Sequence, residues 1–118
     1  NTPVLHNKYL VFHGNEKLKL HKLNSDLKIQ KRDKWLYYTG KMSQEELDER
    51  NWEPFDLVVL KTDIDKFIES DRDLITLQSK IKYQEQIVDY LESVIKIVSN
   101  RQWNIRAALD WIKFTQNA

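Results

Sequence analysis

One segment of the sequence mixes cations and aromatic rings: residues 31–38 read Lys-Arg-Asp-Lys-Trp-Leu-Tyr-Tyr. Lys and Arg neutralise phosphates and release counterions, while aromatic rings offer stacking surfaces that accept any base. The segment therefore predicts contact with a single-stranded nucleic acid, with Tyr37 as the exposed ring. The candidate binding residues are Lys28, Lys31, Arg32, Lys34, Tyr37 and Lys41.

A structural interpretation of the same segment stays open. Trp35 and Tyr38 continue an apolar stripe that begins at Leu20, so both rings are also candidates for the core. Arg32 and Lys34 are harder to explain as core residues. Phosphate contact is the interpretation that we carry forward.

Two pairs of carboxylates invite a comparison with metal-dependent nucleases. Asp63 and Asp65 form one pair, and Asp71 and Asp73 the other. Two-metal hydrolysis needs carboxylates from several elements, whereas acids beside a helix start are favourable in any protein. We expect Asp71 and Asp73 to lie at a helix start for this reason, with no metal site.

Other catalytic patterns are missing from the sequence. His6, His13 and His21 do not have metal-ligand spacing on a helix, and the chain has no cysteine. It has neither a Gly-rich phosphate loop nor a G-x-S-x-G elbow. We therefore expect no cofactor and no enzymatic activity.

Charge is divided unevenly along the 118 residues. Residues 1–41 hold nine Lys and Arg against three acids, a net charge of +6, and the remainder holds ten against fifteen, a net charge of −5. Such asymmetry favours a polyanionic partner for the basic part. We divide the chain into a basic DNA-binding part (1–41), an acidic connector (42–70) and an oligomerisation part (71–118).

The elements that must position these residues are helices. Two Gly and two Pro are too few for a turn-rich all-β fold, so the predicted class is all-α. Thr2 and Pro3 open a first helix, which His13-Gly14-Asn15 interrupts. Asn15 caps a second helix, which Thr39-Gly40 ends.

The connector is predicted to be less regular. Ser43 begins a short acidic helix that cannot continue past Pro54. Residues 55–60 form an extended link with some strand character, and residues 63–69 form one or two helical turns. The longest apolar run that we find in the sequence, Leu57–Leu60, is far too short to span a membrane. No signal peptide is visible.

A long amphipathic helix capped by Ser70 is predicted to follow. It carries a heptad seam from Leu74 to Val98, interrupted by Gln84, and a second stripe one residue earlier at each step. Ser99-Asn100 marks a bend or a cap before a last helix with Trp103, Ala107, Trp111 and Phe114 on one side.

Two adjacent stripes give this helix an unusually wide apolar face. The wide face fits either burial inside one protomer or contact with two neighbouring subunits of a ring. We favour the homo-oligomer, with the interface formed by Leu77, Ile81, Ile87, Val88, Leu91, Val94, Ile95 and Val98.

Several segments, in order, resemble the UvsY family of T-even-type phages. They are residues 5–10 with His13, Arg32-Asp33-Lys34 before Tyr37-Tyr38-Thr39-Gly40, Leu60-Lys61-Thr62, Asp71-Arg72-Asp73-Leu74, Asp89-Tyr90, and residues 100–106 with Phe114. The resemblance covers nearly the whole chain.

The resemblance implies a recombination mediator in the cytoplasm of the infected bacterial host. Such a protein binds single-stranded DNA as a ring, with seven as a candidate subunit number. It contacts the single-strand DNA-binding protein and a RecA-like recombinase and helps the latter replace the former. By this analogy Arg32 and Lys34 hold phosphates and the C-terminal helices build the oligomer. The rival interpretation is an oligomeric protein–protein adaptor without nucleic-acid binding.

Overall fold

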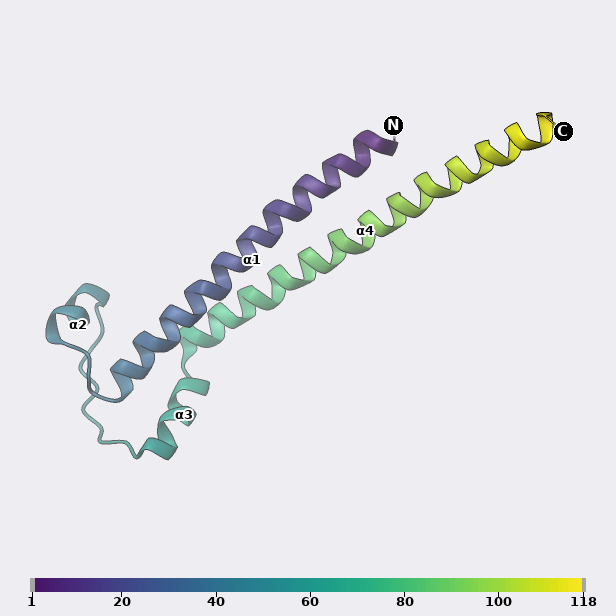
Figure 1. The fold of residues 1–118 in the computed structure, drawn as a ribbon. Coiled ribbons are helices and arrows are strands. Elements are labelled where there is room, and N and C mark those ends of the chain that lie inside the picture. The colour runs from purple at the N-terminus through teal and green to yellow at the C-terminus, as the bar shows by residue number, and fades with distance from the viewer. Residues whose placement is uncertain (1, 118) are drawn as a thin grey trace. The chain divides into compact units, whose positions relative to one another are not determined.

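A computed structural model describes residues 2–117. It contains four helices, α1 (Thr2–Tyr38), α2 (Gln44–Arg50), α3 (Lys61–Glu69) and α4 (Arg72–Asn117), and no strand among the described residues (Figure 1). The all-α prediction is confirmed. Within this range no helix combines the length and apolar composition that a membrane crossing needs.

Helix α1 is continuous, so the predicted break at Gly14 is wrong. A glycine inside a helix costs only about 1 kcal/mol relative to alanine. Contacts to α4 on both sides of Gly14, from His13 and Glu16, offset that cost. The predicted cap by the Thr2 side chain lies outside the described side chains. The predicted C-terminal end of the helix is confirmed, because Gly40 adopts a left-handed φ of 72°.

The connector follows the prediction closely. The Ser43 hydroxyl accepts a hydrogen bond from the backbone N–H of Glu46 and caps α2, and Asn51 closes that helix with a φ of 55°. Residues 52–60 have no regular secondary structure, so the extended link forms without a strand. Helix α3 begins at Lys61, two residues earlier than expected.

Helix α4 differs from the prediction at its start and in its length. Asp71, not Ser70, caps the helix, because its carboxylate accepts the Leu74 backbone N–H at 3.1 Å. Ser70 instead ends α3. The predicted bend at Ser99-Asn100 is wrong, since neither residue forces the backbone out of a helix as proline does.

The chain forms two compact units, one of Asn1–Leu20 with Tyr83–Ala118 and the other of His21–Lys82. Their boundaries fall inside α1 and α4, whereas the predicted functional parts divide at residues 41 and 70. In the first unit, the two helices run antiparallel, as the pairs His6–Ser99 and His13–Glu92 show. In the second, the helical segments enclose a core with Leu47, Ile64, Leu74 and Ile81.

Candidate nucleic-acid interface

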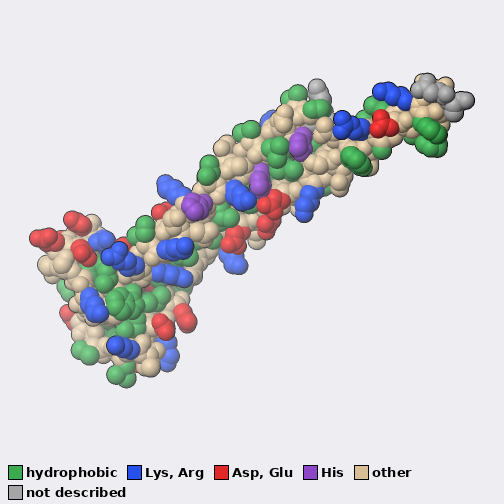
Figure 2. Space-filling view, in the orientation of Figure 1, with side chains coloured by type: hydrophobic (Ala, Val, Ile, Leu, Met, Phe, Trp, Pro, Cys, Tyr) green, Lys and Arg blue, Asp and Glu red, His purple; other side chains and the backbone are tan. Residues whose placement is uncertain are grey.

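The second unit presents a basic face on α1. Lys28, Lys31, Arg32 and Trp35 are all exposed and follow one another at helical spacings of three, one and three residues. With about 100° between successive residues, these four side chains share an arc of roughly 100°. We call this arc the basic face. Figure 2 shows Lys and Arg side chains along α1 and acidic side chains on α2.

No acidic residue of this helix segment lies on the basic face. Asp26 precedes Lys28 by two residues, so it points to roughly the opposite side of the helix. Asp33 turns toward α2, where its carboxylate lies 3.4 Å from the Arg50 guanidinium. The positive charge of Lys28, Lys31 and Arg32 is therefore not neutralised by neighbours on the same face.

Lys34 occupies a different environment from the other predicted cations. Its side chain is buried, with the residue only 5% exposed. The ammonium lies 2.8 Å from Asp73, 3.2 Å from Asp71 and 4.2 Å from the centre of the Trp52 ring. Because its charge is already paired inside the protomer, we leave Lys34 out of the proposed phosphate-binding set.

Asp71 is the centre of this buried group. Burial alone would raise the pKa of its carboxyl, but hydrogen bonds from Tyr38, the Leu74 backbone and Lys34 hold the pKa below its usual value. Burial, and then the hydrogen bond to Asp71, raises the pKa of the Tyr38 hydroxyl. The Asp71-Arg72-Asp73 motif thus caps α4 and fixes the end of α1. In the described part of the chain, no cluster of three or more metal-ligating side chains is found.

Tyr37 is part of an aromatic cluster and is not the freely exposed ring that the sequence suggested. Its ring centre lies 5.3 Å from Trp52 and 5.6 Å from Phe55, and its hydroxyl donates to the Glu53 carbonyl at 2.6 Å. Trp35 is the exposed ring instead, with the Lys41 ammonium 4.6 Å from its centre. Sequence reasoning missed this because the partners of Tyr37 lie in the connector.

The first seam of α4 lies largely inside the protomer. Ile81, Val88, Leu91 and Val98 are buried within the protomer, so we leave them out of the proposed subunit interface. The polar interruption of this seam is satisfied, since the buried Gln84 amide donates to both the backbone carbonyl and the carboxylate of Glu16. Leu77, Ile87, Val94 and Ile95 are only partly covered and keep the interface prediction open.

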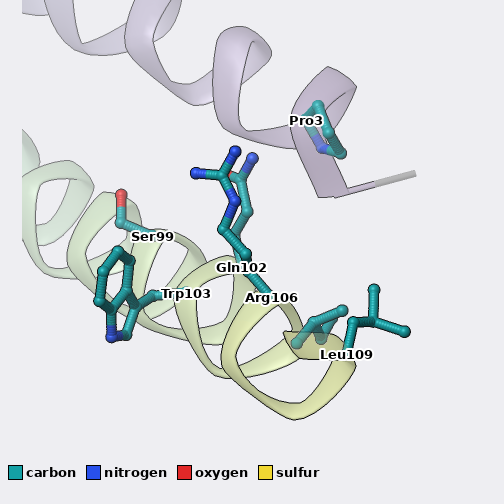
Figure 3. Close-up of a pocket in the computed structure, with 7 residues that line it drawn as sticks. Pro3, Ser99, Gln102, Trp103, Arg106 and Leu109 are labelled. Atoms are coloured by element: carbon teal, nitrogen blue, oxygen red, sulfur yellow. The ribbon is translucent and has the colours of Figure 1, made fainter. Parts of the chain in front are cut away.

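Apolar side chains of α4 also remain uncovered in the first unit, beginning with Tyr83, Tyr90 and Ile97 of the second stripe. Toward the end of α4 they lie on several sides of the helix, and Figure 2 shows exposed hydrophobic side chains there. A groove runs beside this part of the helix, and in Figure 3 Gln102 and Arg106 extend from α4 toward Pro3 of α1. The predicted interface set omitted these exposed apolar residues, which are Tyr83, Tyr90, Ile97, Trp103, Ile105, Leu109, Trp111, Ile112 and Phe114.

Comparison with known proteins places this arrangement in a family. A family model described as "Recombination, repair and ssDNA binding protein UvsY" matches residues 1–117. The chain belongs to the UvsY family. No curated protein matches the chain.

Solved structures share the UvsY-family fold. The bacteriophage T4 recombination mediator protein UvsY superposes with a TM-score of 0.74 in one crystal lattice and 0.72 in another. Sequence identity is 17% and 18%, and the matches cover 97% and 98% of this chain and 80% and 79% of the T4 chain. At this identity the comparison establishes the common fold of the two UvsY-family chains.

Proposed function

We propose that this chain binds single-stranded DNA through the basic face of α1 and acts as a recombination mediator. The observation that carries the proposal is the exposed, acid-free set Lys28, Lys31 and Arg32 in a member of a single-strand DNA-binding family. Lysine and arginine bind the phosphate backbone whatever its sequence. Sequence-independent contact is what a protein that works on any exposed strand requires.

Affinity comes from repetition of this small site. Three cations per protomer provide a weak contact, but linked sites raise the effective concentration of each further contact. The exposed second stripe of α4, with Tyr83, Tyr90 and Ile97, supports a homo-oligomer, because exposed apolar patches mark protein interfaces. The oligomer is a closed ring, with seven subunits as the candidate number.

The wider role follows from wrapping a strand around several protomers. A strand held in this way is bound less tightly by a single-strand DNA-binding protein and remains available to a RecA-like recombinase. The proposed protein therefore helps the recombinase replace the binding protein, in the cytoplasm of an infected bacterium. It contributes no covalent chemistry of its own to strand exchange.

Binding of a fluorescent oligothymidylate at several salt concentrations tests the proposal. Lys28, Lys31 and Arg32 are changed together to Ala, and a matched variant removes Lys22, Lys66 and Lys80, three exposed cations of the same unit that lie off the basic face. For single strands, log K falls by about 0.7 per neutralised phosphate for each unit of log salt. The first variant should lose affinity and salt slope, and the control should keep most of both.

The adaptor function is the second candidate, favoured by the many exposed apolar side chains of α4. If the wild-type oligomer shows no salt-sensitive binding to the oligonucleotide yet captures the recombinase or the binding protein, the adaptor function holds and the DNA-binding proposal fails.

A further inference from the structure

Trp35 differs from the other aromatic residues in its unit. Tyr37, Tyr38, Trp52, Phe55 and Phe67 make ring–ring contacts with one another, with centres 5.0–5.6 Å apart. Among the described rings of that unit, Trp35 alone has no aromatic neighbour and is 42% exposed. Packing accounts for the five clustered rings and leaves the exposure of Trp35 unexplained.

The surroundings of Trp35 suit a ligand that has a planar group and a negatively charged group attached to it. Trp35 lies on the basic face, one helical turn after Lys31 and Arg32. It also lines a groove of about 590 Å³, with Tyr38, Phe55, Val58 and Ile64 among the lining residues. That volume lies within the roughly 300–1,000 Å³ typical of small-ligand sites.

The charges that line the groove indicate which part of a nucleotide would enter it. Lys41 and Lys61 line it together with Asp56 and Asp65, so the groove has no net charge. The basic face beside it carries three cations without an acid. Phosphates therefore favour the basic face, and the neutral, largely apolar groove favours an uncharged base.

We propose that Trp35 is the base-stacking residue of the single-strand site, with the adjacent groove receiving the base. The proposal rests on the proposed function and assigns its base contact. Lys41 lies over the Trp35 ring in an exposed cation–π contact, which is weaker than base–aromatic stacking. An incoming base displaces the ammonium from the ring, and the ammonium then pairs with the phosphate next to that base.

The test compares an oligothymidylate with an abasic strand of equal length and charge. Trp35→Leu should weaken binding of the oligothymidylate by about 5- to 140-fold per stacked base and leave binding of the abasic strand unchanged. Its salt slope should match that of the wild type, since no phosphate contact is lost. Trp35→Phe, which keeps a ring, should bind nearly as the wild type does. Ile29→Ala, at a residue of the same helix that is 61% exposed, is the matched control.

The outcomes separate this proposal from the proposed function. If the wild type binds neither strand, the proposed function itself fails. If the wild type binds oligothymidylate and Trp35→Leu binds it equally well, stacking by Trp35 is refuted and the function stands. Photocrosslinking of wild-type protein to a bromodeoxyuridine strand makes the result independent of variant folding. A crosslink at Trp35 supports the proposal, and a crosslink confined to other residues overturns it.

Discussion

At the scale of single residues, neighbouring cations of α1 have opposite roles. Lys31 and Arg32 are exposed on the basic face, whereas Lys34 is buried against two aspartates and an indole ring. A charge removed from water needs a partner to remain charged, and Asp71 and Asp73 provide it. The same residue type is therefore available for binding at one position and stabilises the fold at another.

Lys34→Ala should destabilise the fold without acting on DNA directly. Breaking a buried ion pair costs roughly 3–5 kcal/mol, and the lower end is expected because Asp71 keeps its hydrogen bonds from Tyr38 and Leu74. Urea unfolding measures the change. Lys31→Ala should show the reverse pattern, with stability within about 0.5 kcal/mol of wild type and weaker binding. Equal stability losses in the two variants would contradict the assignment.

Acid should weaken the Asp71 contacts. Because the folded protein holds the pKa of this carboxyl below its usual value of 3.8, the stability that Asp71 contributes is complete above that value. It is lost as the pH falls from the usual value through the lowered one. Asp71→Asn should be less stable at pH 7 and should lose less on acidification. Unfolding curves at pH 7 and near pH 3 measure this, and parallel losses in both proteins would argue against it.

At the scale of elements, α1 is a single helix that tolerates a glycine in its interior. Gly14 has no strained backbone angle, and a Cβ added there meets no atom within 4 Å. Gly40, which ends the helix, has a φ of 72° that side chains other than glycine rarely adopt. The backbone therefore favours glycine at position 40, whereas nothing in the structure requires glycine at position 14.

Substituting each glycine by alanine tests the continuity of α1. Gly14→Ala should stabilise the protein by about 0.5–1 kcal/mol, since alanine favours an existing helix. Gly40→Ala should destabilise it by about 1–2 kcal/mol, because a left-handed conformation becomes strained. Thermal unfolding followed by circular dichroism gives both signs. A loss of stability from Gly14→Ala would instead support two helices separated by a break at Gly14.

At the scale of the whole molecule, the two stripes of α4 differ in how far the protomer covers them. The seam that includes Val98 is buried by the protomer itself, whereas the second stripe, which includes Ile97, is exposed. A protomer that leaves such a stripe uncovered needs another surface to bury it. We propose that another copy of the chain covers the second stripe.

Adjacent lysine substitutions separate folding from assembly. Ile97→Lys, at a residue 66% exposed in the protomer, should give a smaller, still helical species with weaker DNA binding, because linked sites are lost. Val98→Lys, at a residue 8% exposed, should unfold the first unit instead, because it buries a charge without a partner. Light scattering and circular dichroism distinguish the two results. An unchanged mass for Ile97→Lys would remove this stripe from the interface.

The sequence alone determined the features that depend on local pattern. Steps of three and four residues predicted the seam of α4 and its polar position at Gln84. Ser43 with Glu46 predicted the start of α2, and Gly40 the end of α1. The ordered motifs also identified the family. Each of these signals arises from residues within a few positions of one another.

Only the tertiary structure decided which residues of the basic segment are free. Lys34 is paired because Asp71 and Asp73 reach it from 37 and 39 positions away, and Tyr37 is packed because Trp52 and Phe55 cover it. Helix continuity through Gly14 was decided in the same way, by contacts with α4. Local preferences differ by about 1 kcal/mol or less, so packing between distant residues overrides them. A list of residue types records neither that packing nor the exposure that it leaves to Trp35.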